Sequence, residues 1–140
     1  MINKQQAEQS RLLLIDFIEV LKKKYSFDEK QVNVCGFSQG AIMDYGMGLT
    51  RPDKVKGIAL LSGRLMDEIK PLVRPAAELK DLRVFMSHGT NDAMLGIHYA
   101  REGKTYLESV GVHPHYNEYP EGHIISSEML NDLVKWLSAE

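Results

Sequence analysis

The stretch Val34-Cys35-Gly36-Phe37-Ser38-Gln39-Gly40 is the most informative part of the sequence, because it reads as a short buried strand that runs directly into a glycine-flanked serine. Residues 36–40 fit the pattern G-x-S-x-G, in which a serine occupies a strained turn between a strand and a helix. Glycine is expected at both flanking positions, because a Cβ there would strike the neighbouring strand or helix. The turn would hold the Ser38 hydroxyl at the carboxyl end of a sheet, where α/β proteins bind their ligands. A serine in a tight turn without a catalytic role is the alternative.

The segments around this stretch alternate between helix-like and strand-like patterns. Strands are predicted at residues 32–36, 55–63, 83–89 and 115–120. Helices are predicted at residues 3–24, 39–49 and 97–110, within 64–81, and after a cap at Ser126 or Ser127. Apolar strands separated by helices indicate an α/β fold, with a parallel sheet of about four strands and helices on both faces. We expect residues 1–140 to form one domain.

The two outer helices carry apolar patterns that predict which side faces the core. In the first helix this side is expected to hold Ala7, Ser10, Leu14, Phe17, Ile18, Leu21 and Tyr25. In the last helix the apolar residues are Met129, Leu130, Leu133, Val134, Trp136 and Leu137.

Composition excludes several classes of function. The net charge of −2 and the lack of a basic stripe argue against a nucleic-acid partner. The single cysteine, Cys35, permits no internal disulfide and is expected to be a small core residue. The polar start of the chain does not resemble a signal peptide, and no apolar run is long enough to span a membrane. A cytoplasmic location is therefore predicted.

A catalytic serine needs an adjacent base, which a third group must hold in place. Asp92 follows the third predicted strand and His123 follows the fourth. Ser38, Asp92 and His123 thus all come from strand ends on one edge of a parallel sheet, and we expect them to form one hydrogen-bonded group. The alternatives are that Asp92 is a loop residue or helix cap and that His123 is a surface histidine. Asp67 and Glu121 are the weaker candidates for the acid.

The other histidines are predicted to have no catalytic role. His88 lies too early in its turn to act as the base and is expected to be structural. His98, His113 and His115 are expected at the surface, and nothing near them has the spacing of metal ligands. No metal site and no cofactor are predicted.

Four sequence blocks carry a resemblance to a known family: GFSQGA, LLSGRL, HGTND and YPEGHII. In this order and spacing they resemble the carboxylesterase/phospholipase family of α/β hydrolases, which includes the acyl-protein thioesterases. The resemblance runs from about residue 5 to the C-terminus. It departs at Ala41, where a second glycine is common, and at Ala93-Met94-Leu95, where Val-Pro or a similar pair is common.

The resemblance implies a role for each site residue. Ser38 would be the nucleophile, Asp92 the acid and His123 the base, acting on carboxylic esters or thioesters without a cofactor. The backbone N–H of Gln39, at the start of its helix, would be one donor of the oxyanion hole. Leu65, Met66, Met94 and Leu95 border the expected acyl site, although the first two could equally be ordinary core residues.

The family has several strands and a helix before the segment that begins here at residue 1, including a His-Gly loop that gives the second oxyanion donor. Without them, the strand at residues 32–37 would have an unpaired apolar edge. We expect a homo-oligomer in which a second copy covers this strand, or a domain-swapped first helix that hides the same surface. Truncation and an inactive hydrolase remnant that binds a partner at this edge are the alternatives.

Overall fold

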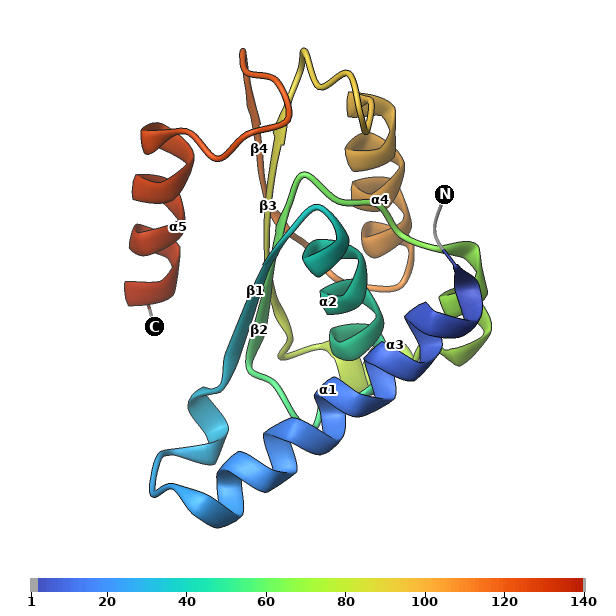
Figure 1. The fold of residues 1–140 in the computed structure, drawn as a ribbon, viewed down its shortest axis with the longest axis vertical. Coiled ribbons are helices and arrows are strands. Elements are labelled where there is room, and N and C mark those ends of the chain that lie inside the picture. Colours follow the sequence, from blue (N-terminus) through green and yellow to red (C-terminus); the bar gives the residue numbers. More distant parts are fainter. Residues whose placement is uncertain (1–2, 140) are drawn as a thin grey trace.

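The computed structural model describes residues 3–139, and its centre is a four-stranded parallel sheet in the order β1-β2-β3-β4 (Figure 1). The strands are β1 (Asn33–Phe37), β2 (Gly57–Leu61), β3 (Arg83–Gly89) and β4 (His115–Tyr119). Each strand pairs in parallel with the next one along the chain, and Cys35 of β1 lies beside Ala59 of β2. The predicted α/β class and the four-stranded parallel sheet are confirmed.

Helices cover both faces of the sheet, as predicted (Figure 1). They are α1 (Lys4–Lys24), η1 (Glu29–Gln31), α2 (Gln39–Thr50), η2 (Asp67–Leu72), α3 (Ala76–Leu79), α4 (Ile97–Ser109) and α5 (Ser127–Ser138). Helix α5 lies on one face, whereas α1, α2 and α4 lie on the other. The segment 64–81 holds two short helices in place of the single one predicted.

The core has one main cluster on each face of the sheet. Beneath α5, the buried side chains are Ala59, Leu61, Phe85, Leu133 and Trp136, with Phe37 packed against them. The larger cluster on the opposite face includes Ile18, Tyr45, Leu49, Ile58 and Leu107. The side chains of β1 therefore alternate, with Phe37 toward α5 and Val34 toward α1 and α2.

Helix α1 has nearly the predicted bounds, and its predicted side is confirmed only in part: Ile18 is buried as predicted, but the buried side is rotated toward Arg11 and Ile15. Its buried residues are Arg11, Ile15 and Ile18, whereas Phe17 and Tyr25 are 55% and 58% exposed. Arg11 can be buried because Glu8 and the Thr50 hydroxyl, which lies 2.8 Å from Nη1, satisfy its guanidinium. The prediction was wrong for Phe17 and Tyr25 because leucines, valine and phenylalanine occur on both sides of this helix.

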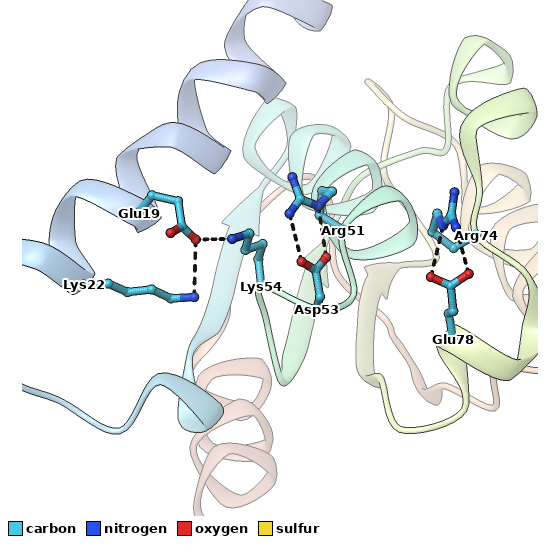
Figure 2. Close-up of polar contacts among 7 residues, drawn as sticks. All are labelled: Glu19, Lys22, Arg51, Asp53, Lys54, Arg74 and Glu78. Atoms are coloured by element: carbon cyan, nitrogen blue, oxygen red, sulfur yellow. Dashed lines mark hydrogen bonds and ion pairs between the residues drawn. The ribbon is translucent and has the colours of Figure 1, made fainter.

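One ion pair, Glu19–Lys54, joins the C-terminal half of α1 to the turn after α2 (Figure 2). Glu19 contacts both Lys22 of its own helix and Lys54 of the α2–β2 turn. In the same turn, Arg51 makes a two-bonded pair with Asp53 at 3.0 and 2.8 Å. Pairs of this kind at the surface contribute about 0–1 kcal/mol each. Their contribution to the stability of the fold is therefore small.

Strand β1 is an edge strand of the sheet in residues 3–139. Cys35, in the middle of this strand, is exposed, so the prediction that it is a core residue was wrong. The cause is its position, because one side of β1 carries no neighbouring strand in the described part of the chain. None of the helices in residues 3–139 combines the length and the apolar character that crossing a membrane requires.

Candidate active site

Ser38 occupies the turn between β1 and α2 in a strained conformation. Its φ of 58° and ψ of −112° lie in a region that residues with a side chain rarely adopt, and it is the N-cap residue of α2. Its N–H donates to the Leu61 carbonyl oxygen at 2.8 Å, which anchors the turn to the end of β2. Strain of this kind concentrates at functional sites.

Only the first of the two glycines in G-x-S-x-G is required by close packing. A Cβ on Gly36 would lie 2.3 Å from the backbone carbon of Gly40, so no side chain fits there. A Cβ on Gly40 would meet nothing within 4 Å. The expectation that a Cβ would clash at both glycines was therefore wrong for Gly40, because a Cβ there would face open space.

The side chains of Ser38, His123 and Asp92 lie within hydrogen-bond distance of one another. The Ser38 hydroxyl, at the end of β1, donates to His123 Nε2 at 3.0 Å. The Nδ1–H of His123, from the loop after β4, donates to Asp92 Oδ2 at 2.6 Å. The structure thus brings together the three residues that the sequence analysis singled out, although they are up to 85 positions apart in the chain.

The carboxylate of Asp92 is held by its own loop. The N–H groups of Met94 and Leu95 donate to Oδ1 at 2.9 and 2.8 Å. Burial opposes ionisation, but hydrogen bonds from the Leu95 N–H, the His123 ring and the Met94 N–H outweigh it and hold the pKa of Asp92 below its ordinary value. The acid is therefore ionised at neutral pH and can accept the Nδ1–H of His123.

His88 is buried behind this loop and does not contact Ser38. Its Nε2–H donates to the Leu95 carbonyl oxygen at 2.6 Å and lies 3.5 Å from Asp92 Oδ2. His88 thus fastens the loop that presents the acid, in keeping with a structural role.

Comparison with known proteins identifies the family. The sequence profile of the Phospholipase/Carboxylesterase family matches residues 2–140. The chain belongs to this family. Acyl-protein thioesterase 1 of Kluyveromyces lactis is 33% identical over 111 residues, which are 74% of this chain and 47% of the relative. A probable carboxylesterase of rice (Oryza sativa subsp. japonica) is 30% identical over 109 residues, covering 77% of this chain and 41% of the relative.

A solved structure of the same family agrees with the fold. The crystal structure of Arabidopsis thaliana SOBER1 superposes with a TM-score of 0.84 at 25% identity, covering 98% of this chain and 65% of SOBER1. This phospholipase/carboxylesterase chain therefore spans less than half the length of the curated relatives named above and about two thirds of SOBER1.

The residues predicted to border the acyl site lie in different environments. Met66 is buried, 5% exposed, and lines an apolar cavity of about 230 Å³ between α1, α2 and η2. Leu65 is half-buried against the core on the same side. Met94 is 75% exposed, whereas Leu95 is half-buried and contributes its backbone to the Asp92 and His88 hydrogen bonds. Their contact with substrate stays a prediction.

The weaker candidates lie outside the group formed by Ser38, His123 and Asp92. Asp67 is exposed and pairs with Lys70 at 2.8 Å, and the backbone of Glu121 bonds to Tyr119 and Asn91. The predicted surface histidines His98, His113 and His115 are exposed. In the described part of the chain, no group of three or more His, Cys, Asp or Glu side chains could hold a metal ion.

Two contributors to the site were not foreseen. The Phe37 ring lies 4.9 Å from the His123 ring at 37° and so supports the imidazole from the side of α5. The backbone N–H groups of Met94 and Leu95 hold the acid. The apolar residue before the nucleophilic serine is a weak sequence signal for the support that Phe37 gives to His123. Backbone donors in a loop leave no sequence signal at all.

Proposed function

We propose that this chain is a serine hydrolase that cleaves carboxylic esters or thioesters through an acyl-enzyme on Ser38. The observation that carries the proposal is the unbroken chain of hydrogen bonds from Ser38 through His123 to Asp92. Family membership supports the same chemistry, because the relatives named above are a thioesterase and a probable carboxylesterase.

In this mechanism Ser38 Oγ attacks the carbonyl carbon while His123 Nε2 takes the hydroxyl proton. Ionised Asp92 orients the imidazole and stabilises its positive charge. The N–H of Gln39, the first residue of α2, is one donor for the oxyanion, helped by the positive end of the helix. As the bond from the carbonyl carbon to the leaving group breaks, His123 gives its proton to the departing alkoxide or thiolate, and a water molecule activated by the same imidazole then hydrolyses the acyl-enzyme and releases the acid.

The N–H of Gln39 is the one oxyanion donor named in this mechanism. The loss of one donor typically lowers the rate about 10²–10³-fold, so the rate depends strongly on a second donor. The alternative function, an inactive hydrolase fold that binds a partner, is favoured by one observation, the edge of β1 that no strand covers within residues 3–139. A cytoplasmic location, a single domain over residues 1–140 and self-association over residues 32–37 stay predictions from the sequence.

Treatment with a fluorophosphonate followed by intact-mass analysis and peptide mapping tests the proposal. We expect one adduct, on Ser38, and hydrolysis of p-nitrophenyl acetate or butyrate that is abolished in Ser38→Ala and strongly reduced in His123→Ala. Ser127→Ala, which alters an exposed serine at the start of α5, is the matched control and should keep full activity. An adduct on another residue, or no adduct and no hydrolysis, would refute the enzymatic proposal.

A further inference from the structure

One arginine of this chain has no oxygen acceptor among the described residues. The chain has six arginines. Five of them donate to a carboxylate or a backbone carbonyl within residues 3–139, as Figure 2 shows for two: Arg11, Arg51, Arg74, Arg83 and Arg101. Arg64 is half-buried, and its Nε is buried without a hydrogen-bond partner in the same range. A guanidinium withdrawn from water normally has an acceptor, so Arg64 indicates a place for an anionic ligand.

Arg64 follows the carboxyl end of β2, which lies beside the nucleophile. Phe37 of β1 and Leu61 of β2 are register partners, and the Ser38 N–H bonds to the Leu61 carbonyl oxygen. Ser62 is therefore the residue of β2 next to Ser38. Neighbouring strands lie about 4.8 Å apart and a chain advances at most about 3.5 Å per residue, so the Cα atoms of Ser38 and Arg64 lie within roughly 12 Å of each other. One small substrate can contact both side chains.

The segment after β2 runs between the first turns of two helices. Ser62 has a φ of 55°, which turns the chain, and a Cβ on Gly63 would lie 2.4 Å from the Cβ of Ala41 in the first turn of α2. The Arg64 guanidinium lies over the ring of Tyr99 in the first turn of α4, 5.2 Å from its centre. Helices α2 and α4 lie on the same face of the sheet (Figure 1). Neither begins with a side-chain cap, so the partial positive charge of their first N–H groups also favours an anion here.

The charge balance around Arg64 fits a ligand with one negative charge. Asp67, three residues later, is exposed and pairs with Lys70 at 2.8 Å. The pKa of Asp67 is lowered mainly by that hydrogen bond from Lys70 and to a smaller extent by the charge of Arg64. The single guanidinium of Arg64 matches the one charge of a carboxylate more closely than the charge of nearly two on a phosphate group.

We propose that Arg64 binds a carboxylate group of the substrate, so that this chain prefers esters or thioesters that also carry a carboxylate. The planar guanidinium holds the carboxylate through two parallel hydrogen bonds, and the Tyr99 ring supports its face. The scissile carbonyl of the same molecule lies at Ser38. The inference rests on the proposed hydrolase function and adds the charge of the substrate to it. The carboxylate belongs to the acyl or to the alcohol part, and the assays below separate the two.

Pairs of matched esters test the preference. The mono-p-nitrophenyl ester of glutaric acid and p-nitrophenyl valerate have acyl chains of equal length, and only the first ends in a carboxylate. p-Acetoxybenzoate and its methyl ester make the same comparison on the alcohol part. In one of the two pairs, Arg64→Met should lower kcat/KM for the charged ester on the order of tenfold to a hundredfold, mainly through KM, and leave the neutral ester nearly unchanged.

Two further variants separate a bidentate contact from a general effect of charge. Arg64→Lys keeps the charge but loses the planar fork, so it should retain only part of the preference. Arg74→Met removes an exposed arginine that pairs with Glu78, and it is the matched control that should keep the whole preference. Arg64→Met should unfold in urea at the same or a higher concentration than the parent, because it removes a buried donor that has no partner.

Nuclear magnetic resonance of isotope-labelled Ser38→Ala gives a readout that needs no turnover. Because the Arg64 Nε is buried, the signal of its N–H should be observable near neutral pH. It should shift and saturate on titration with monomethyl glutarate or with p-acetoxybenzoate, and stay unchanged with methyl valerate. The loss of this signal in Arg64→Met identifies it, and Arg64→Lys serves the same purpose if Arg64→Met does not fold.

Two results would overturn the inference. One is an equal effect of Arg64→Met on the charged and the neutral ester in both pairs. The other is an Arg64 Nε–H signal that does not respond to either carboxylate. Hydrolysis without a preference for charge would keep the hydrolase function and remove the carboxylate site. A saturating shift without any hydrolysis would keep the carboxylate site and refute the hydrolase function.

Discussion

Replacement of Asp44 by asparagine should remove most of a pH dependence of stability that the fold imposes on this residue. Asp44 lies in α2 with 6% of its surface exposed, and its Oδ2 lacks a partner among the described residues. Burial raises its pKa from 3.8 to about 7. The folded chain therefore holds a proton on Asp44 at pH values where the unfolded chain has released it.

The sign and size of the effect follow from that difference. Between pH 3.8 and about 7 the native state binds more protons than the unfolded state, so the free energy of unfolding falls as the pH rises. About 3 pH units at 1.36 kcal/mol each amount to about 4 kcal/mol. The contribution is fully present below pH 3.8 and lost above about pH 7. An asparagine does not titrate, so its own cost is constant.

Urea unfolding of the parent and of Asp44→Asn, measured from pH 4.5 to pH 8.5, gives the free energies of unfolding to compare. The difference between the two proteins isolates Asp44, because the other titrating groups are common to both. We expect the free energy of unfolding of Asp44→Asn to increase relative to that of the parent as the pH rises, by a few kcal/mol in total. Asp16→Asn, at an exposed residue of α1, should run parallel to the parent. A constant difference between Asp44→Asn and the parent at every pH would refute the reasoning.

Two further predictions test the turn and the acid. Gly36→Ala should destabilise the chain by about 1–3 kcal/mol, because its Cβ would lie 2.3 Å from the Gly40 backbone, whereas Gly40→Ala should be neutral or stabilising by about 0.5–1 kcal/mol in urea unfolding. Asp92→Asn should keep the fold but lower the esterase rate constant by roughly 10³–10⁴-fold, because the amide no longer holds the reactive tautomer of His123; a smaller loss than tenfold would contradict the role of the acid.

The sheet and the meeting of Ser38, Asp92 and His123 could be predicted because both rest on local patterns. Short apolar runs followed by glycine or polar turns mark buried parallel strands, and the carboxyl ends of such strands share one edge. Once three strands are assigned, the residues that follow them must approach one another. The helix cap at Ser126 follows from equally local chemistry, since its hydroxyl accepts the Met129 N–H at 3.2 Å.

The buried side of α1 could not be predicted in the same way. Apolar residues occur on most sides of this helix, and the side that packs is decided by Arg11, a residue that a hydrophobic pattern assigns to the surface. Its burial depends on Thr50, which is 39 positions away. The prediction that Cys35 is a core residue was wrong for a related reason. Whether a strand is central or at an edge depends on the number of strands present, and the residues of the strand itself do not specify that number.

The nucleophile and the acid of the candidate active site are held by different parts of the sheet. The acid is held by the loop after β3, through contacts of Asp92 with Met94 and Leu95, and it also contacts His123 in the loop after β4. Ser38 instead continues directly from the edge strand, and its position depends on the pairing of β1 with β2 and on the bond to Leu61. A local opening of β1 would therefore displace Ser38 and the Phe37 ring that supports His123, and would leave the hydrogen bonds of Asp92 to Met94 and Leu95 unchanged.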